Sequence, residues 1–264
     1  VENLLSTEGR GLAMALSTIN VGRLTLPAAC TGCAKQCVTI VRKWGNERVQ
    51  WGMAVGLHEP GREKISYIAA TTFAMEAVTW LTSSWVDKGG VDIRIEAAMA
   101  KLFCTESLWK IVDLTLQLRG GRGYEKSQSL KARGEIGYPV ERMMRDCRIN
   151  TILEGSSEIM KLFLAREAMD SHLKRAGVLL KKNISFGQKL KSGLKILGFY
   201  LKWYPTQWFK SWKGKSRPSM GELRSEFAKI EKAGHRLAGT IFYYMARYQQ
   251  GLEKKQLILG RLME

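Results

Sequence analysis

The sequence has few prolines, few cysteines and no long apolar run, and each scarcity excludes a class of protein. Five prolines, 9% aromatic and 25% charged residues among 264 exclude a disordered, collagen-like or low-complexity chain. Five cysteines in a chain of this length do not build a disulfide scaffold, so we expect a reducing compartment. No uninterrupted apolar run approaches the roughly 18 residues that span a bilayer, so we expect no membrane-spanning segment.

Familiar catalytic and metal-binding patterns are also missing. The three histidines form neither HxxxH nor HExxH, and no GxSxG motif accompanies them, so no hydrolytic zinc site or catalytic triad can be argued. We expect His172 to be a surface side chain. Cys30, Cys33 and Cys37 could share one helix face, but no fourth ligand is evident, and we predict packing positions and no metal.

Helical periodicity dominates what is present. Three stretches carry apolar residues at the spacing of one helix face, and glycine and proline mark the breaks between them. Ser156 or Ser157 is expected to cap the helix that follows Gly155. We predict an all-α fold, an antiparallel bundle of helices of about 20 to 28 residues. The three sets are Ile95, Met99, Leu102, Leu108, Trp109, Val112 and Leu116; Ile159, Leu162, Phe163, Met169 and Leu173; and Leu223, Phe227, Ile230, Leu237, Ile241 and Met245.

Positive charge is concentrated in one part of the chain. Lys and Arg outnumber Asp and Glu by 42 to 24, which predicts attraction to nucleic acid, a lipid surface or phosphorylated ligands. Residues 174–217 hold ten Lys, two Arg and no acidic residue, together with eight aromatic residues. We therefore expect a helical domain at 1–172, a basic aromatic segment at 173–218 and the start of another helical unit at 219–264. The chain begins without Met and ends within an apolar-periodic stretch, so we take it to be part of a longer protein.

Two local features suggest chemistry without identifying it. Gly121 and Gly123 in "RGGRGY" could cradle a phosphate, although a helix break uses glycine as well. Glu154 precedes a helix start, where the helix dipole favours a carboxylate in any case.

Five strings resemble acyl-CoA dehydrogenases and occur in the same order: "INVGRLTLPAA", "NERVQWG", "EAAMAKLF", "LQLRGGRGY" and "YPVERMMRDCRINTILEGSSEIMKLFLAREAM". Together they cover residues 1 to about 172, which corresponds to the C-terminal helical domain of that family. The remainder resembles the extra C-terminal region of the very-long-chain type. Residues 125–138 depart from the family pattern by lengthening a loop by about ten residues.

The resemblance implies a reaction and its residues. These flavoenzymes remove a proton and a hydride from the α and β carbons of an acyl-CoA, and the position of their catalytic base matches Glu154. Some members carry the base at the position that is Gly22 here, which glycine cannot serve. Asn20, Arg23 and Gly155 match positions near the acyl-CoA thioester.

The resemblance also implies an FAD site and the partners of the enzyme. Arg48 is expected to reach a flavin pyrophosphate across a subunit interface, so we expect a homo-oligomer, a dimer or a tetramer. Electrons are expected to pass to an electron-transfer flavoprotein. The positions that match flavin contacts are Arg48, Gln50, Trp51, His58, Glu59, Gln117, Leu118, Arg119, Gly120, Gly121, Ser156, Ser157 and Glu158.

We therefore expect an FAD-dependent dehydrogenase of long-chain acyl-CoA in fatty acid β-oxidation, inactive as this chain alone. Residues 174–217 are expected to bind an anionic membrane surface without crossing it. The compartment would be the bacterial cytoplasm with inner-membrane association, or the mitochondrial matrix and inner membrane. The alternative is a non-catalytic, membrane-associated scaffold of the same fold. A nucleic-acid binder is disfavoured because no recognition motif accompanies the charge.

Overall fold

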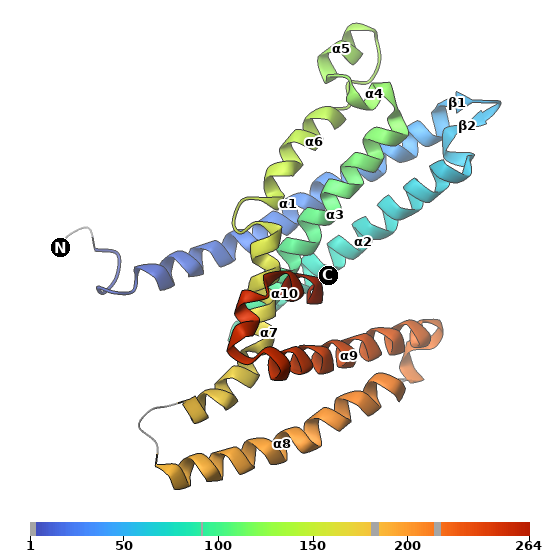
Figure 1. Ribbon diagram of the computed structural model, residues 1–264. Helices are drawn as coiled ribbons and strands as arrows, with labels where there is room; N and C mark the ends of the chain where they lie inside the picture. The colour runs from blue at the N-terminus through green and yellow to red at the C-terminus, as the bar shows by residue number, and fades with distance from the viewer. Residues whose placement is uncertain (1–3, 91, 181–184, 214–217) are drawn as a thin grey trace. The chain divides into compact units, whose positions relative to one another are not determined.

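The computed structural model describes residues 4–90, 92–180, 185–213 and 218–264, and it confirms the all-α fold class (Figure 1). The long helices are α1 (Gly11–Glu47), α2 (Glu59–Lys88), α3 (Arg94–Arg119), α7 (Ser157–Leu180), α8 (Phe186–Lys213) and α9 (Arg224–Tyr248). The short ones are α4 (Gly121–Tyr124), α5 (Ser127–Ala132), α6 (Val140–Arg148) and α10 (Gln256–Leu262). The 3-10 segments are η1 (Val55–Leu57), η2 (Ile149–Thr151), η3 (Pro218–Leu223) and η4 (Gln249–Lys254).

The chain forms two compact units, Val1–Met160 and Lys161–Glu264, and α7 begins in the first and continues in the second. The expected domain limits at residues 172 and 218 stay predictions. Of the expected basic segment, Lys181, Lys182, Lys215 and Arg217 lie outside the described residues.

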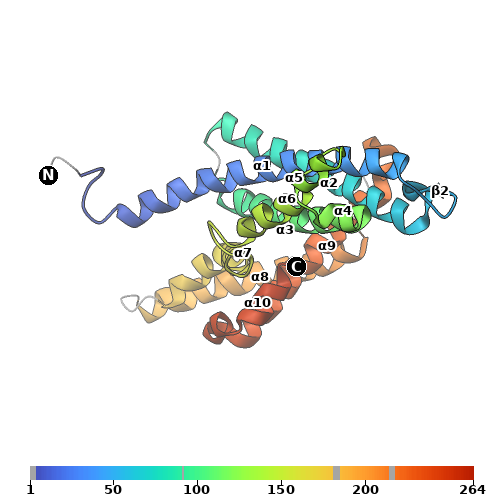
Figure 2. The ribbon, with the colours of Figure 1, turned by 90° about the horizontal axis from the view of Figure 1, so that it is seen from above.

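The first unit is built on three antiparallel helices. Helices α1, α2 and α3 pack against one another, and α6 packs on α3 (Figures 1 and 2). Their apolar positions meet in one core, which includes Val41, Ile68, Met75, Leu108 and Val112. Helix α1 is longer than expected, with 37 residues, and its first turns extend beyond α2 and α3. Ile95 and Met99, expected on the apolar face of α3, are exposed, because the buried face begins at Ala97 and Ala98 instead.

All five cysteines belong to this core. Cys30, Cys37, Cys104 and Cys147 are buried, and Cys33 packs against them. Burial raises the pKa of Cys30 and of Cys147 to about 12 and that of Cys104 to about 11, so these thiols stay protonated at neutral pH. Among the described residues, no three His, Cys, Asp or Glu side chains are placed to hold a metal ion.

Helix α1 is long and apolar enough to cross a bilayer by length and composition alone, which differs from the expectation for this sequence. Its contacts are those of a core helix: Cys30, Ala34, Cys37, Ile40 and Val41 are at most 1% exposed within the unit. The apolar composition of the second half of α1 therefore reflects packing against α2 and α3.

A two-stranded hairpin is the exception to the helical fold. Strands β1 (Val49–Gln50) and β2 (Met53–Ala54) pair in antiparallel fashion, joined by Trp51 and Gly52. Both turn residues have positive φ, 49° for Trp51 and 82° for Gly52, as a type I′ turn requires. Trp51 is 94% exposed, so this strained turn presents an indole ring to the surroundings.

The second unit packs α8 on α9, and α7 on α9 and α10. The expectation that His172 is a surface side chain is wrong: it is buried, and its Nδ1 lies 2.8 Å from the Tyr200 hydroxyl. Tyr200, Trp203 and Phe242 surround its ring at centroid distances of 5.0 to 6.1 Å. The aromatic residues of α8 therefore divide into an inward group around His172 and an outward group.

Two glycines of α4 make a matched test of this packing. A methyl group at Gly123 would lie 2.5 Å from the Leu116 carbonyl oxygen and 2.9 Å from its Cα, whereas one at Gly121 would meet nothing within 4 Å. Gly123→Ala should lower the free energy of unfolding by about 1–3 kcal/mol, because backbone atoms must shift. Gly121→Ala should not lower it. Equal urea midpoints for the two variants would contradict the packing of α4 on α3.

Candidate active site

Glu154 lies in the turn that joins η2 to α7. Glu154 has φ 54° and Gly155 has φ 101°, so a glutamate is held in the left-handed region, where such side chains are uncommon. Ser156 caps α7 as predicted, since the Ile159 N–H donates to its Oγ at 3.5 Å. The turn therefore ends in a helix N-terminus directly after the carboxylate.

The Glu154 carboxylate packs on the backbone of α1 at Gly22. A Cβ built on Gly22 would lie 2.2 and 2.3 Å from the two carboxylate oxygens. The two positions at which the family resemblance places a base thus share one space, and the glycine leaves that space to Glu154. Oε2 is buried and has no hydrogen-bond partner within the described part of the chain. A buried, unpartnered carboxylate oxygen is suited to accept a proton.

The predicted substrate residues Asn20 and Arg23 lie beside this carboxylate. Arg23 is 8% exposed, and its Nε donates to the Glu154 carbonyl oxygen at 3.5 Å. Its Nη1 donates to Asn20 Oδ1 at 3.3 Å. Burial lowers the pKa of Arg23, and the Glu154 carboxylate opposes that change. These residues and Gly155 therefore form one cluster with the expected base.

Lys101 and Glu106, which the sequence analysis did not single out, also hold the turn at Glu154 and Gly155. Lys101 on α3 is fully buried, and its Nζ donates to the Gly155 carbonyl oxygen at 2.7 Å. Ser157 Oγ donates a hydrogen bond to Glu106 on the same helix. Ser157 is thus tied into the turn as a buried residue. Lysine rarely lies in a core, so its presence inside the apolar string "AAMAKLF" was the available signal.

A groove of about 220 Å³ lies at the other end of the first unit. Five predicted flavin contacts line it: Gln50, Trp51, His58, Gln117 and Leu118. The His58 Nε2 donates to the Gln50 carbonyl oxygen at 3.0 Å, and the Trp51 ring meets the His58 ring edge-on at 6.1 Å. Val55, Pro60, Gly61 and Lys64 complete the lining and were not predicted.

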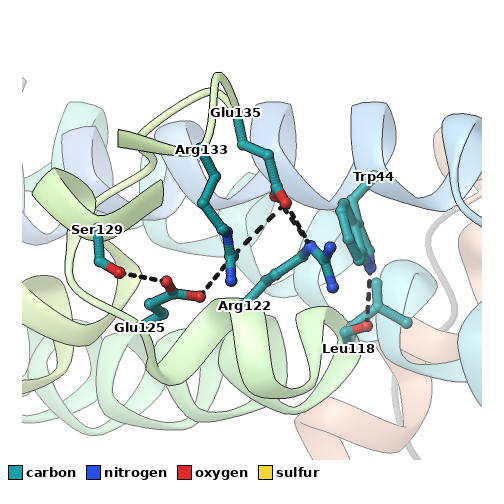
Figure 3. Close-up of polar contacts among 7 residues, drawn as sticks. All are labelled: Trp44, Leu118, Arg122, Glu125, Ser129, Arg133 and Glu135. Atoms are coloured by element: carbon teal, nitrogen blue, oxygen red, sulfur yellow. Dashed lines mark hydrogen bonds and ion pairs between the residues drawn. The ribbon is translucent and has the colours of Figure 1, made fainter. Parts of the chain in front are cut away.

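Trp44 connects the groove to two predicted arginines. Its indole N–H donates to the Leu118 carbonyl oxygen at 3.1 Å (Figure 3). The Arg48 Cζ lies 5.9 Å from the Trp44 ring and the Arg119 Cζ 4.7 Å from it. Arg119 is buried behind the groove and is not part of its lining.

The remaining predicted residues lie elsewhere in the unit. Glu59 is the exposed first residue of α2, and Gly120 and Gly121 join α3 to α4. Glu158 is exposed in the first turn of α7, beside Ser156 and Ser157. None of these lines the groove.

The expected base and the groove lie at different places along helix α1. Gly22 contacts Glu154 about a third of the way along α1, and α1 ends at Glu47, just before Arg48. At 1.5 Å per residue, the 25 intervening steps correspond to about 38 Å. The carboxylate and the groove are therefore well separated along the first unit.

The chain has close relatives among characterised protein families. A family model described as "Acyl-CoA dehydrogenase, C-terminal domain" matches residues 9–169. The probable acyl-CoA dehydrogenase FadE10 of Mycobacterium tuberculosis is 50% identical over 264 residues, which is 100% of this chain and 41% of that protein. The mitochondrial very long-chain specific acyl-CoA dehydrogenase of Macaca fascicularis is 31% identical over 178 residues, 67% of this chain and 26% of that protein.

A solved structure agrees with the fold. An acyl-CoA dehydrogenase of Bacillus anthracis, complexed with FAD, superposes with a TM-score of 0.72 at 26% identity over 99% of this chain and 42% of that one. The chain therefore spans about two fifths of the length of the relatives that it matches throughout.

The buried Lys101 makes a pH test of the turn. Burial lowers the pKa of Lys101 below its ordinary value of 10.5, while Cys30, Glu106 and Glu154 oppose the change. Between the lowered pKa and 10.5 the unfolded chain binds a proton that the folded chain has lost, so stability gained through this group rises with pH. The free energy of unfolding, measured in urea at increasing alkaline pH, should therefore rise in the wild type relative to that of Lys101→Met.

Lys110→Met, on the exposed face of the same helix, is the control, and it should change with pH as the wild type does. A constant difference between the wild type and Lys101→Met would mean that Lys101 keeps its proton when folded.

Proposed function

Since this chain belongs to the acyl-CoA dehydrogenase family, we propose that it supplies the catalytic base and part of the flavin site of an FAD-dependent acyl-CoA dehydrogenase. The observation that carries the proposal is the Glu154 carboxylate on Gly22, with a buried oxygen that has no partner in the described residues. The reaction proposed is the oxidation of an acyl-CoA to a trans-2-enoyl-CoA in fatty acid β-oxidation.

In this proposal Glu154 takes the α-proton of the thioester substrate. Arg23 and Lys101 bond the two carbonyl groups of the Glu154–Gly155 turn, so the backbone that carries the carboxylate is held in place before substrate binds. Bound FAD would supply the acceptor for the hydride that leaves the β-carbon. Asn20 and Arg23 would border the thioester end of the substrate.

The groove residues suit a flavin cofactor. Indole and imidazole rings offer stacking surfaces, and Gln50 and Gln117 offer amides. Arg48 is not part of the lining but lies over the Trp44 ring, and it would offer a cation for a phosphate. A groove of about 220 Å³ fits one part of the cofactor, so residues outside this chain would complete the site.

The separation along α1 supports a homo-oligomer. Because the groove and the carboxylate lie about 38 Å apart along α1, we propose that the groove contacts the flavin whose ring lies beside a second copy's base. Similar proteins of the very long-chain type support a long-chain acyl-CoA as substrate. We propose an electron-transfer flavoprotein as the electron acceptor.

Replacing the base tests the reaction directly. In the whole protein, Glu154→Gln should retain FAD but reduce the rate of flavin bleaching by palmitoyl-CoA by about 10²- to 10⁴-fold, because the general base is lost. Asp113→Asn, an exposed carboxylate on α3, is the control and should bleach at the wild-type rate. If Glu154→Gln bleached the flavin at nearly the wild-type rate, Glu154 would not be the catalytic base. A wild-type protein that does not bleach at all would favour the scaffold alternative.

We also propose that α8 attaches the protein to an anionic membrane surface. An outward apolar stripe follows α8 at helical spacing, and its members are 55–74% exposed: Leu190, Leu194, Leu197, Leu201, Trp208 and Trp212. Lys191, Lys195, Lys202 and Lys210 on the same helix are exposed, and α8 contains no acidic residue. A helix of this kind lies in the plane of the interface. Peripheral association with a bacterial or mitochondrial inner membrane would follow.

Vesicle sedimentation tests the membrane proposal. The protein should sediment with phosphatidylglycerol vesicles at low salt, and a variant with Trp208→Ala and Trp212→Ala should remain mostly in the supernatant. Trp80→Ala, which removes a 70% exposed ring from α2, should sediment like the wild type. Trp203 is not a suitable target because it packs on His172. Equal sedimentation of the stripe variant and the wild type would contradict the proposal.

A further inference from the structure

Residues 125–138, which lengthen a loop relative to the family pattern, fold into a small element with its own interior. Leu130 of α5 is fully buried, and Ser127 Oγ donates to the Gly137 carbonyl oxygen at 2.6 Å. A Cβ at Gly137 would lie 2.6 Å from Ser127 Oγ and 2.7 Å from the Ser127 carbonyl oxygen. Only glycine lets the two ends of the element approach this closely.

Ion pairs tie this element to the turn after α3. Glu135 accepts two hydrogen bonds from Arg122 Nε, at 2.9 and 3.0 Å (Figure 3). Arg133 Nη2 lies 2.7 Å from Glu125 Oε2 and 3.5 Å from Glu135 Oε1. Ser129 Oγ donates to the other oxygen of Glu125. Two arginines and two glutamates thus alternate across the start and the end of the element.

The last residue of the element reaches the groove wall through one arginine. The Arg119 Cζ lies 5.1 Å from the Tyr138 ring and 4.7 Å from the Trp44 ring, on a side chain that is 4% exposed. Arg119 Nε has no hydrogen-bond partner in the described residues, and the groups that act on this guanidinium include Tyr138 and Glu135 of the element. Trp44 in turn donates to the Leu118 carbonyl oxygen, and Leu118 lines the groove.

We propose that residues 125–138 are a brace that positions the groove wall, with Tyr138 and Glu135 as positioning residues. Tyr138 holds Arg119 against Trp44, and Glu135 holds Arg122 just beyond the Gly120–Gly121 turn. Both contacts converge on the stretch 117–123 that carries Gln117 and Leu118. The ligand of this wall is the flavin of the proposed function, on which the inference rests.

FAD affinity of the whole protein tests the brace. Tyr138→Leu should weaken FAD binding about five-fold, the factor that corresponds to loss of one cation–π contact of ~1 kcal/mol, and should alter the visible circular dichroism of the bound flavin. Tyr138→Phe keeps the ring and should bind FAD as the wild type does. Glu135→Gln should also weaken binding, and it serves if Tyr138→Leu does not fold. Asp146→Asn, which breaks the exposed Arg142–Asp146 pair on α6, is the control.

Amide hydrogen exchange of the flavin-free protein gives a readout that does not depend on the proposed function. Exchange in residues 117–123 should be faster in Tyr138→Leu and Glu135→Gln than in the wild type, Tyr138→Phe and Asp146→Asn. The brace would be overturned if Tyr138→Leu and Glu135→Gln both exchanged residues 117–123 at the wild-type rate and both bound FAD with an affinity within two-fold of that of the wild type. A wild-type protein that binds no FAD, with the exchange differences present, would overturn the proposed flavin site and leave the brace as a mechanical element.

Discussion

The contact between the Glu154 carboxylate and the bare backbone of Gly22 is the constraint on which the candidate site depends. The carboxylate fits only because α1 has no side chain at that point, and it arrives there through two successive residues with positive φ. Such a turn costs conformational energy, so it persists only where its surroundings fix it. Lys101 bonded to the Gly155 carbonyl, Arg23 at the Glu154 carbonyl and Glu106 at Ser157 provide that fixation from two helices.

Helix α1 gives the site its second constraint, which is distance. One core helix carries Gly22 about a third of the way along and ends at Glu47, so the base and the groove share one element but lie about 38 Å apart along it. The same helix supplies much of the core, through Cys30, Ala34, Cys37 and Val41. In the proposed homo-oligomer, a spacer of this length would let the base and the groove of one copy serve different flavins. At the groove end, Trp44 lies in the last turn of α1, and Arg48 and Arg119 both contact its ring. Arg119 is the side chain that the proposed brace positions through Tyr138.

Much of the fold could be predicted from the sequence, because apolar residues at helical spacing and glycine or proline at the breaks have direct physical causes. Glu154 could be singled out only through resemblance, since a lone carboxylate before a helix is stabilised by the helix in any case. Lys101 escaped prediction because its partner is a backbone carbonyl 54 residues away, and no local pattern encodes that contact. His172 was expected at the surface and Trp203 in a membrane-binding segment, yet their rings lie 5.0 Å apart inside the second unit. The hairpin at Trp51 was missed because a bulky residue occupies a turn position that asparagine or glycine normally takes.

The most direct test of this account is the rate of flavin reduction in a Gly22→Ala variant of the whole protein. The added methyl group would overlap both carboxylate oxygens and displace the base. The account therefore predicts that the rate of flavin reduction by acyl-CoA falls about 10²-fold or more. FAD should stay bound, and the free energy of unfolding should not fall, since only the mobile end of Glu154 must move and alanine suits a helix better than glycine does. Gly32→Ala, on the same helix with nothing within 4 Å of the new methyl group, should reduce flavin at the wild-type rate. A Gly22→Ala rate within two-fold of the wild type would contradict the claim that Glu154 acts from this position.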